Sequence, residues 1–221
     1  MKKATLDQAS KILSVFEDTP LEQVQSLLES GFLADLRDAD IAQINRDQFR
    51  RGVGLKPLET AVLLRHLGII AVPATTERFI ASEKFVINTD RNDQVKISYL
   101  GDNFKGCFLS KTEAPIQETV LRYQKLVWSS TDDFIIAELG GEAKAETTLA
   151  QVFALMQIQK NGEAGVLFNN GWENIFHVRD TNGVLRAVGI DWRFGGWRAY
   201  TGFVGGRGGW RGGCQVFSSN S

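Results

Sequence analysis

The chain has 221 residues, of which 43% are hydrophobic and 23% are charged, and its formal net charge is −1. These values are typical of a globular protein with enough apolar material for a core, and they argue against a disordered chain. A net charge near zero gives the whole protein no attraction for nucleic acid or for a membrane surface.

Neither a secretory signal nor a stretch of about 20 apolar residues is visible in the sequence. We therefore expect a cytoplasmic protein without a membrane span, with export by another route left open. The two cysteines, Cys107 and Cys214, are too few for a disulfide framework. Whether these two residues pair with each other stays open at this point.

The first 70 residues have the pattern of a helical unit. A capping box at residues 5–8 predicts a helix that runs to about residue 16. Pro20 stands at the start of a second predicted helix, which ends at Gly31. Two further helices are predicted over residues 41–51 and from residue 57 to Gly68. Docking to another protein and oligomerisation are both open as roles for this unit.

Strands and helices alternate after Gly68. Predicted strands cover residues 69–72, 84–87, 95–100 and 134–137, where β-branched and aromatic residues are concentrated. Predicted helices cover residues 116–128 and about 147–160, and Thr147 is expected to cap the second one.

The last part of the chain is predicted to form β-structure, with strands at residues 166–168, 175–179 and 184–192. Asn182 and Gly183 predict a tight hairpin between the last two strands, because both residues readily adopt positive φ angles. The sequence thus predicts an α+β fold. A helical N-terminal unit covers residues 1–70, and a mixed α/β unit over residues 71–221 ends in antiparallel strands.

The residues that could carry catalysis or bind a metal ion form no recognisable motif. His66 is interpreted as a helix-end or partly buried histidine, and His177 is expected to face outward or toward a cross-strand neighbour. A dyad of Cys107 with His177 stays open as the basis of a hydrolase, the least favoured alternative. Asp132 and Asp133 are interpreted as part of a solvated turn. We predict a protein that is not an enzyme, holds no metal ion and uses no cofactor.

The C-terminal segment has a composition of its own. Residues 186–213 contain ten glycines and five arginines, against a single acidic residue, Asp191. Four of the five tryptophans follow Asn170. This combination of Gly, Arg and aromatic residues marks residues 189–214 as the candidate functional segment.

The frame of this segment resembles the variable region of diversity-generating retroelement target proteins. The resemblance rests on Trp192, Gly196, Trp197, Trp210, Gly212 and the end formed by Val216, Phe217 and Ser218. In that family, a reverse transcriptase rewrites the end of the target gene at adenines of a template, and the segment is usually displayed on a C-type-lectin-like fold. The rest of the chain is similar to uncharacterised bacterial proteins.

The resemblance implies a ligand-binding surface with no catalysis. Its variable positions would contact a protein or another macromolecule, and the tryptophans would hold the surface in place. The expected contact residues are Arg193, Phe194, Arg198, Tyr200, Arg207, Arg211 and Cys214, with Gly213 as a further variable position. The expected scaffold residues are Trp192, Trp197 and Trp210. Arg and aromatic side chains dominate binding hot spots, which favours the same interpretation on physical grounds.

RNA binding is the main alternative. Residues 205–213 resemble an RGG segment, in which Arg pairs with phosphates and aromatic side chains stack on bases. The five arginines and one acid of residues 186–213 give a local charge of +4. The apolar pair Val216 and Phe217, which predicts a closing strand, argues against a disordered tail.

Overall fold

The computed structural model describes residues 5, 7, 10–11, 14–40, 44, 46–55, 62–90, 92–93, 95–202 and 209–220. The chain divides into two compact units, Met1–Glu59 and Thr60–Ser221. The boundary lies earlier than the predicted residue 70, because residues 64–70 belong to a strand of the second unit and not to a helix.

The N-terminal unit is helical. Its helices are α2 (Leu21–Glu29), α3 (Phe32–Asp38) and α4 (Arg46–Gly52), and Gly31 separates the first two at a positive φ of 76°. Gly31 thus ends the second predicted helix as expected. The predicted helix over residues 41–51 is α4, shifted toward the C-terminus, with residues 41–43 and 45 outside the described residues. Of the predicted helix at residues 5–16, residues 6, 8, 9, 12 and 13 also lie outside them.

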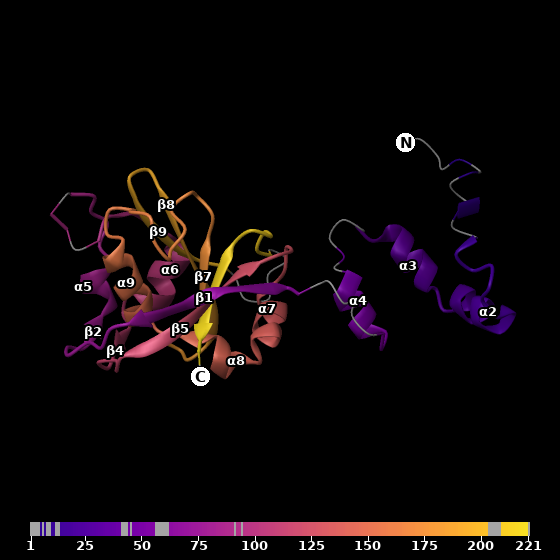
Figure 1. The fold of residues 1–221 in the computed structure, drawn as a ribbon, viewed down its shortest axis with the longest axis horizontal. Coiled ribbons are helices and arrows are strands. Elements are labelled where there is room, and N and C mark those ends of the chain that lie inside the picture. Colours follow the sequence, from indigo (N-terminus) through magenta and orange to yellow (C-terminus); the bar gives the residue numbers. More distant parts are fainter. Residues whose placement is uncertain are drawn as a thin grey trace. The chain divides into compact units, whose positions relative to one another are not determined.

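The C-terminal unit is built on one mixed sheet of eight strands among the described residues (Figure 1). The strand order is β1-β5-β10-β7-β8-β9-β3, with β6 beside β7. The strands of this sheet are β1 (Leu64–Val72), β3 (Ile97–Leu100), β5 (Thr119–Leu126), β6 (Glu146–Thr147), β7 (Asn174–Arg179), β8 (Leu185–Arg193), β9 (Gly196–Thr201) and β10 (Gln215–Ser219). A separate pair joins β2 (Phe79–Ile80) to β4 (Thr112–Glu113).

Helices cover both faces of this sheet (Figure 1). The helices are α5 (Ala81–Lys84), α6 (Asp102–Phe108), α7 (Asp132–Leu139), α8 (Glu142–Ala145) and α9 (Leu149–Ile158). One core joins α6 and α9 to the face that carries Phe176 and Phe217. The second core joins Ile135 of α7 to the other face, which carries Ile175 and Val216. This alternation follows from the two-residue period of a strand.

The sequence predictions fail where a short apolar run fits either a strand or a helix. Residues 116–128 were predicted to be helical, but β5 occupies 119–126 because it pairs with both β1 and β10. Residues 134–137 were predicted to be a strand, but they lie in α7. This helix has acidic residues in its first turn and ends at Gly140 with φ of 95°.

Four smaller predictions also change. The predicted helix from residue 57 to Gly68 overlaps β1, and residues 56–61 lie outside the described residues. The predicted strand at 84–87 is the end of α5 and the turn after it, and no strand forms at 166–168. The cap of α9 is Thr148, one residue later than expected, and it forms a capping box with Gln151.

The hairpin of β7 and β8 is confirmed. Gly183 adopts φ of 79° in the turn, and the buried Asp180 carboxylate accepts hydrogen bonds from the backbone N–H groups of Asn182 and Val184. The Arg186 guanidinium lies 2.6 Å from the same carboxylate. The Asn-Gly signal therefore works together with a carboxylate that holds the turn closed.

This carboxylate makes stability depend on pH. Burial alone would raise the pKa of Asp180, but the hydrogen bonds from Arg186, Val184 and Asn182 lower it on balance. A lowered folded-state pKa contributes stability above the unfolded-state value of about 3.9, and this contribution is lost as pH falls through the folded-state pKa. We expect Asp180→Asn to reduce the urea midpoint at neutral pH and to flatten its decline in acid. The exposed Asp133→Asn is the control, and equal acid profiles for the two variants would contradict the assignment.

Candidate binding surface of the C-terminal segment

The hairpin of β8 and β9 sends alternate side chains to opposite faces of the sheet. Trp197 lies on the face of the larger core, is fully buried, and donates its indole N–H to the Gln159 carbonyl at 2.9 Å. Trp192 contacts Trp197 edge to face at a centroid distance of 5.2 Å. Two of the three predicted scaffold tryptophans therefore lie within the interior packing of the unit.

The opposite face of the same hairpin carries a buried ion pair. Asp191 is fully buried, and both of its carboxylate oxygens accept hydrogen bonds from Arg198, at 2.6 and 2.5 Å. The Arg193 Nε atom lies 3.2 Å from the same carboxylate. Hydrogen bonding to Asp191 raises the pKa of Arg198, which keeps this arginine charged. Two predicted contact arginines thus share one acid, which offsets one of their two positive charges and fixes both side chains in position.

Tyr200 and Trp210 lie together on this face. A Cβ atom added at Gly189 would lie 2.7 Å from the Tyr200 ring and 3.0 Å from the Trp210 ring, so both rings rest on the backbone of β8. The Arg198 guanidinium carbon is 5.9 Å from the centre of the Tyr200 ring. Burial raises the pKa of the Tyr200 phenol. Tyr200 therefore presents only part of its ring to solvent.

Trp210 is anchored by a buried polar cluster. Its indole N–H donates to Asp132 at 2.7 Å, and its backbone forms a bridge with Ser130. The His177 Nε2 atom lies 3.3 Å from the same Asp132 oxygen, and the His177 side chain is 1% exposed. The predictions of an outward-facing His177 and a solvated Asp132 were therefore wrong. These residues meet because α7, β7 and the C-terminal segment converge on one face of the sheet.

Cys214 does not lie on the surface. Its thiol is fully buried and donates to a Glu173 oxygen at 3.1 Å. Burial, with the Glu173 carboxylate as a second cause, raises the pKa of this thiol to about 12. The expected contact role of Cys214 is thus replaced by a packing role. Cys107 is partly exposed, and both cysteines are free thiols.

Three of the remaining contact positions are exposed. Phe194 is 87% exposed at the turn between β8 and β9, where its φ angle is 55°. The side chain of Arg193 is 46% exposed and also bonds the Gly171 carbonyl at 2.8 Å. Arg211 is exposed as well. Arg207 lies outside the described residues.

Two exposed tryptophans that the sequence analysis did not assign border this surface. Trp172 is 40% exposed and Trp128 is 53% exposed. A Cβ atom at Gly213 would lie 3.0 Å from the Trp172 ring, and one at Gly212 would lie 3.1 Å from the Trp128 backbone. No local pattern could have found them, because their proximity to the segment depends on chain folding alone.

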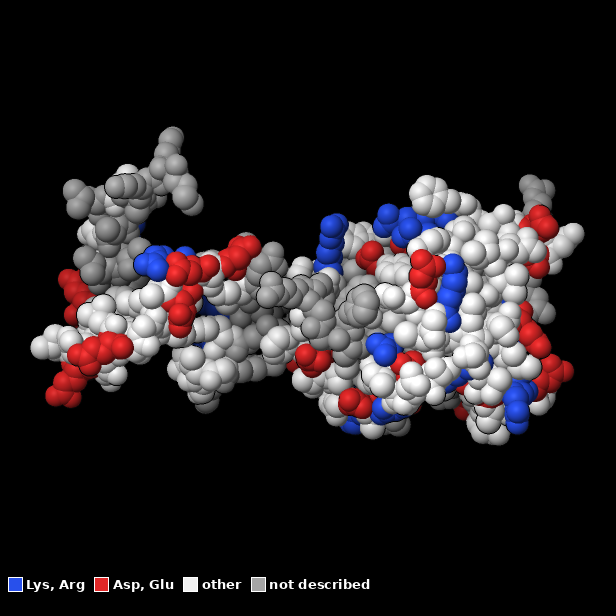
Figure 2. Space-filling model, turned by 180° about the vertical axis from the view of Figure 1, so that it is seen from behind, with Lys and Arg blue, Asp and Glu red and all other residues white. Residues whose placement is uncertain are grey.

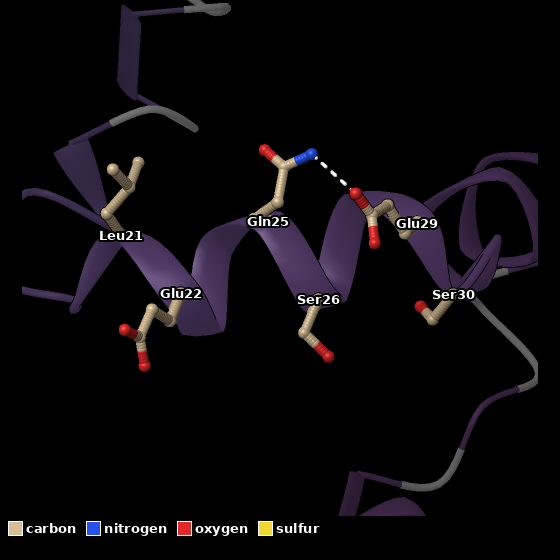
Figure 3. A pocket seen from close by; sticks show the side chains of 6 residues that line it. All are labelled: Leu21, Glu22, Gln25, Ser26, Glu29 and Ser30. Carbon is tan, nitrogen blue, oxygen red and sulfur yellow. Dashed lines mark hydrogen bonds between the residues drawn. The ribbon is translucent and has the colours of Figure 1, made fainter.

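Hollows elsewhere in the molecule are weaker candidates for a binding site. Six residues from 21 to 30 line a groove along α2, all on one helix and its end (Figure 3). A hollow of about 260 Å³ lies between residues 74–79, Lys84 and α9. Neither contains any of the predicted site residues. Among the described residues, no group of three His, Cys, Asp or Glu side chains could hold a metal ion, and no helix is long and apolar enough to cross a membrane.

Comparison with known proteins adds no further assignment. No protein-family model, no curated protein and no solved structure matches the chain.

Proposed function

We propose that this is a binding protein that recognises a protein or another macromolecule through residues 189–214, and that a retroelement diversifies this segment. One observation carries the proposal. Most positions that the resemblance makes constant have no room for another side chain, whereas several positions that it makes variable lie at the surface.

The constant positions are held by packing. Trp197 is fully buried, and Trp192 packs against it and over Gly162. A Cβ atom at Gly196 would lie 2.7 Å from the Ser98 backbone nitrogen, and one at Gly212 would lie 2.8 Å from the Val127 carbonyl oxygen. Real Cβ atoms do not approach backbone atoms this closely, so a larger residue would displace the neighbouring chain.

The variable positions have space around them. Phe194, Arg193 and Arg211 are exposed, and they carry the Arg and aromatic chemistry of binding hot spots. A rigid sheet beneath such residues reduces the entropy lost on binding. Arg198 and Tyr200 belong to the same face but are partly buried, so we assign them to its floor. Cys214 is excluded from the contact set.

The proposal includes a C-type-lectin-like form of display and a cytoplasmic location. The C-type-lectin-like form of display is supported by a single unit in which helices flank a mixed sheet and the C-terminal strand β10 lies inside that sheet. A cytoplasmic location is supported by the two unpaired cysteines, since disulfides are rare in the cytosol.

The gene neighbourhood tests the proposal. We expect a reverse transcriptase gene near this one, with a near-copy of the coding sequence for residues 189–214 that differs only at adenines of the copy. The differing codons should include those of Arg193, Phe194 and Arg211 and should spare Trp192 and Trp197. A complete genome that contains neither the gene nor the copy would remove the retroelement from the proposal.

A binding assay separates this function from RNA binding. Arg193 and Arg198 both pair with Asp191, which reduces the positive charge that they offer to phosphates. On the side of the α+β unit shown in Figure 2, Lys and Arg side chains are interspersed with Asp and Glu. We therefore expect no binding of a fluorescein-labelled single-stranded RNA at moderate salt. Binding that weakens steeply with salt and with Arg211→Ala would favour the RNA alternative.

A further inference from the structure

Strand β1 (Leu64–Val72) forms one edge of the large sheet. Eight of its nine residues pair with β5 on one side, and no other strand of the described residues pairs with it on the other side. An edge strand presents unpaired backbone N–H and C=O groups that can bind another strand. The opposite edge is formed by β3, which has only four residues. The longer edge is therefore the stronger template for pairing.

The side chains of β1 leave this edge unprotected. Residues 67–72 contain no charged residue and no proline, and Pro73 follows only after the strand has ended. Leu67 is 39% exposed and Ile69 is 57% exposed, and Ala71 is exposed beside them. Natural edge strands are usually blocked by lysine, proline, a bulge or short length. The single irregularity lies between His66 and Gly68, so residues 68–72 remain regular.

We propose that β1 pairs in antiparallel orientation with β1 of a second copy of this chain, which joins the two sheets across a twofold axis. A twofold axis brings identical strands together in this orientation. The self-pairing puts no like charges opposite each other, because the nearest charge on the strand, Arg65, lies toward its start in both copies. Ile69 and Ala71 of each copy then contact the apolar side chains of the partner strand.

The nature of the exposed residues favours a second copy over a foreign strand. A foreign partner would be selected by charges or pockets along the edge, and residues 67–72 carry no charge. The nearest charged neighbour on the same face is Arg122 of β5, the cross-strand partner of Ile69. In the paired sheets, each Arg122 would be separated from its counterpart by both β1 strands. An uncharged, apolar strand is complementary to itself.

Light scattering on the full chain tests this proposal. We expect the wild type to elute as a dimer of the 24.5 kDa chain at about 100 µM. Ile69→Lys and Ala71→Lys should each weaken the dimer at least tenfold, because each places one ammonium group per copy beside the apolar side chains of the partner strand, with the two like charges close to the axis. Val86→Lys is the matched control: its exposure of 50% is similar to that of Ile69, but it lies outside β1, and its dimer should persist.

Thermal denaturation of each variant shows whether the exposed substitution has left the fold intact. A monomeric wild type at this concentration would overturn the proposal. A dimer that Ile69→Lys does not weaken would also overturn it and would point to the helical N-terminal unit instead. Both outcomes are independent of the ligand-binding function proposed above.

Discussion

Replacing Trp197 with alanine is expected to lower the free energy of unfolding of the C-terminal unit by about 3–5 kcal/mol. Trp197 is fully buried, contacts Trp192 and donates a hydrogen bond to the Gln159 carbonyl. The substitution leaves a large cavity and removes one of the two hydrogen bonds that the Gln159 carbonyl accepts, the other coming from the Gly162 N–H. Urea denaturation followed by tryptophan fluorescence and by circular dichroism measures the loss.

Phe194→Ala is the matched control for this prediction. Phe194 lies three residues before Trp197 in the same hairpin, but it is 87% exposed. We expect its removal to change the free energy of unfolding by less than about 0.5 kcal/mol. Similar losses for the two variants would mean that the hairpin is not divided into a packed side and an exposed turn.

Replacing Asp191 with alanine is expected to cost about 3 kcal/mol, near the lower limit for removing one partner of a buried ion pair. Asp191 is fully buried, and its loss leaves Arg193 and Arg198 without a counter-charge. The expected loss of stability is at the low end of the range because both arginines are partly exposed, which lets water solvate their charges.

A surface ion pair provides the control for this second prediction. Asp102 pairs with Lys105 at 3.0 Å, but its side chain is 95% exposed. We expect Asp102→Ala to cost less than about 1 kcal/mol. Equal losses for Asp102→Ala and Asp191→Ala, measured in the same urea titration, would show that the buried pair does not hold the hairpin.

Local sequence signals predicted those elements in which local and tertiary preferences agree. The hairpin of β7 and β8 formed at Asn182 and Gly183, and α9 began within one residue of the expected cap. Local signals did not predict β5 and α7, because a short apolar run fits both the two-residue period of a strand and the 3.6-residue period of a helix. Pairing with β1 and β10 makes β5 a strand, whereas the acidic first turn and Gly140 favour a helix at α7.

Part of the candidate site could likewise be predicted from the sequence. The composition of residues 186–213 pointed to the segment, and the size of tryptophan pointed to Trp197 as a core residue. The burial of Cys214 against Glu173 could not be predicted, because these residues are 41 positions apart in the chain. The cluster of Asp132, His177 and Trp210 has no local signature for the same reason.

The binding function that we propose depends on a division between constant and variable positions within residues 189–214. The most direct measurement is the sequence of this gene in many isolates of one lineage. We expect amino-acid changes concentrated at Arg193, Phe194 and Arg211, with Trp192 and Trp197 unchanged and residues 64–188 nearly constant. Changes spread evenly along the chain, or changes at Trp197 as frequent as those at Phe194, would contradict the proposal.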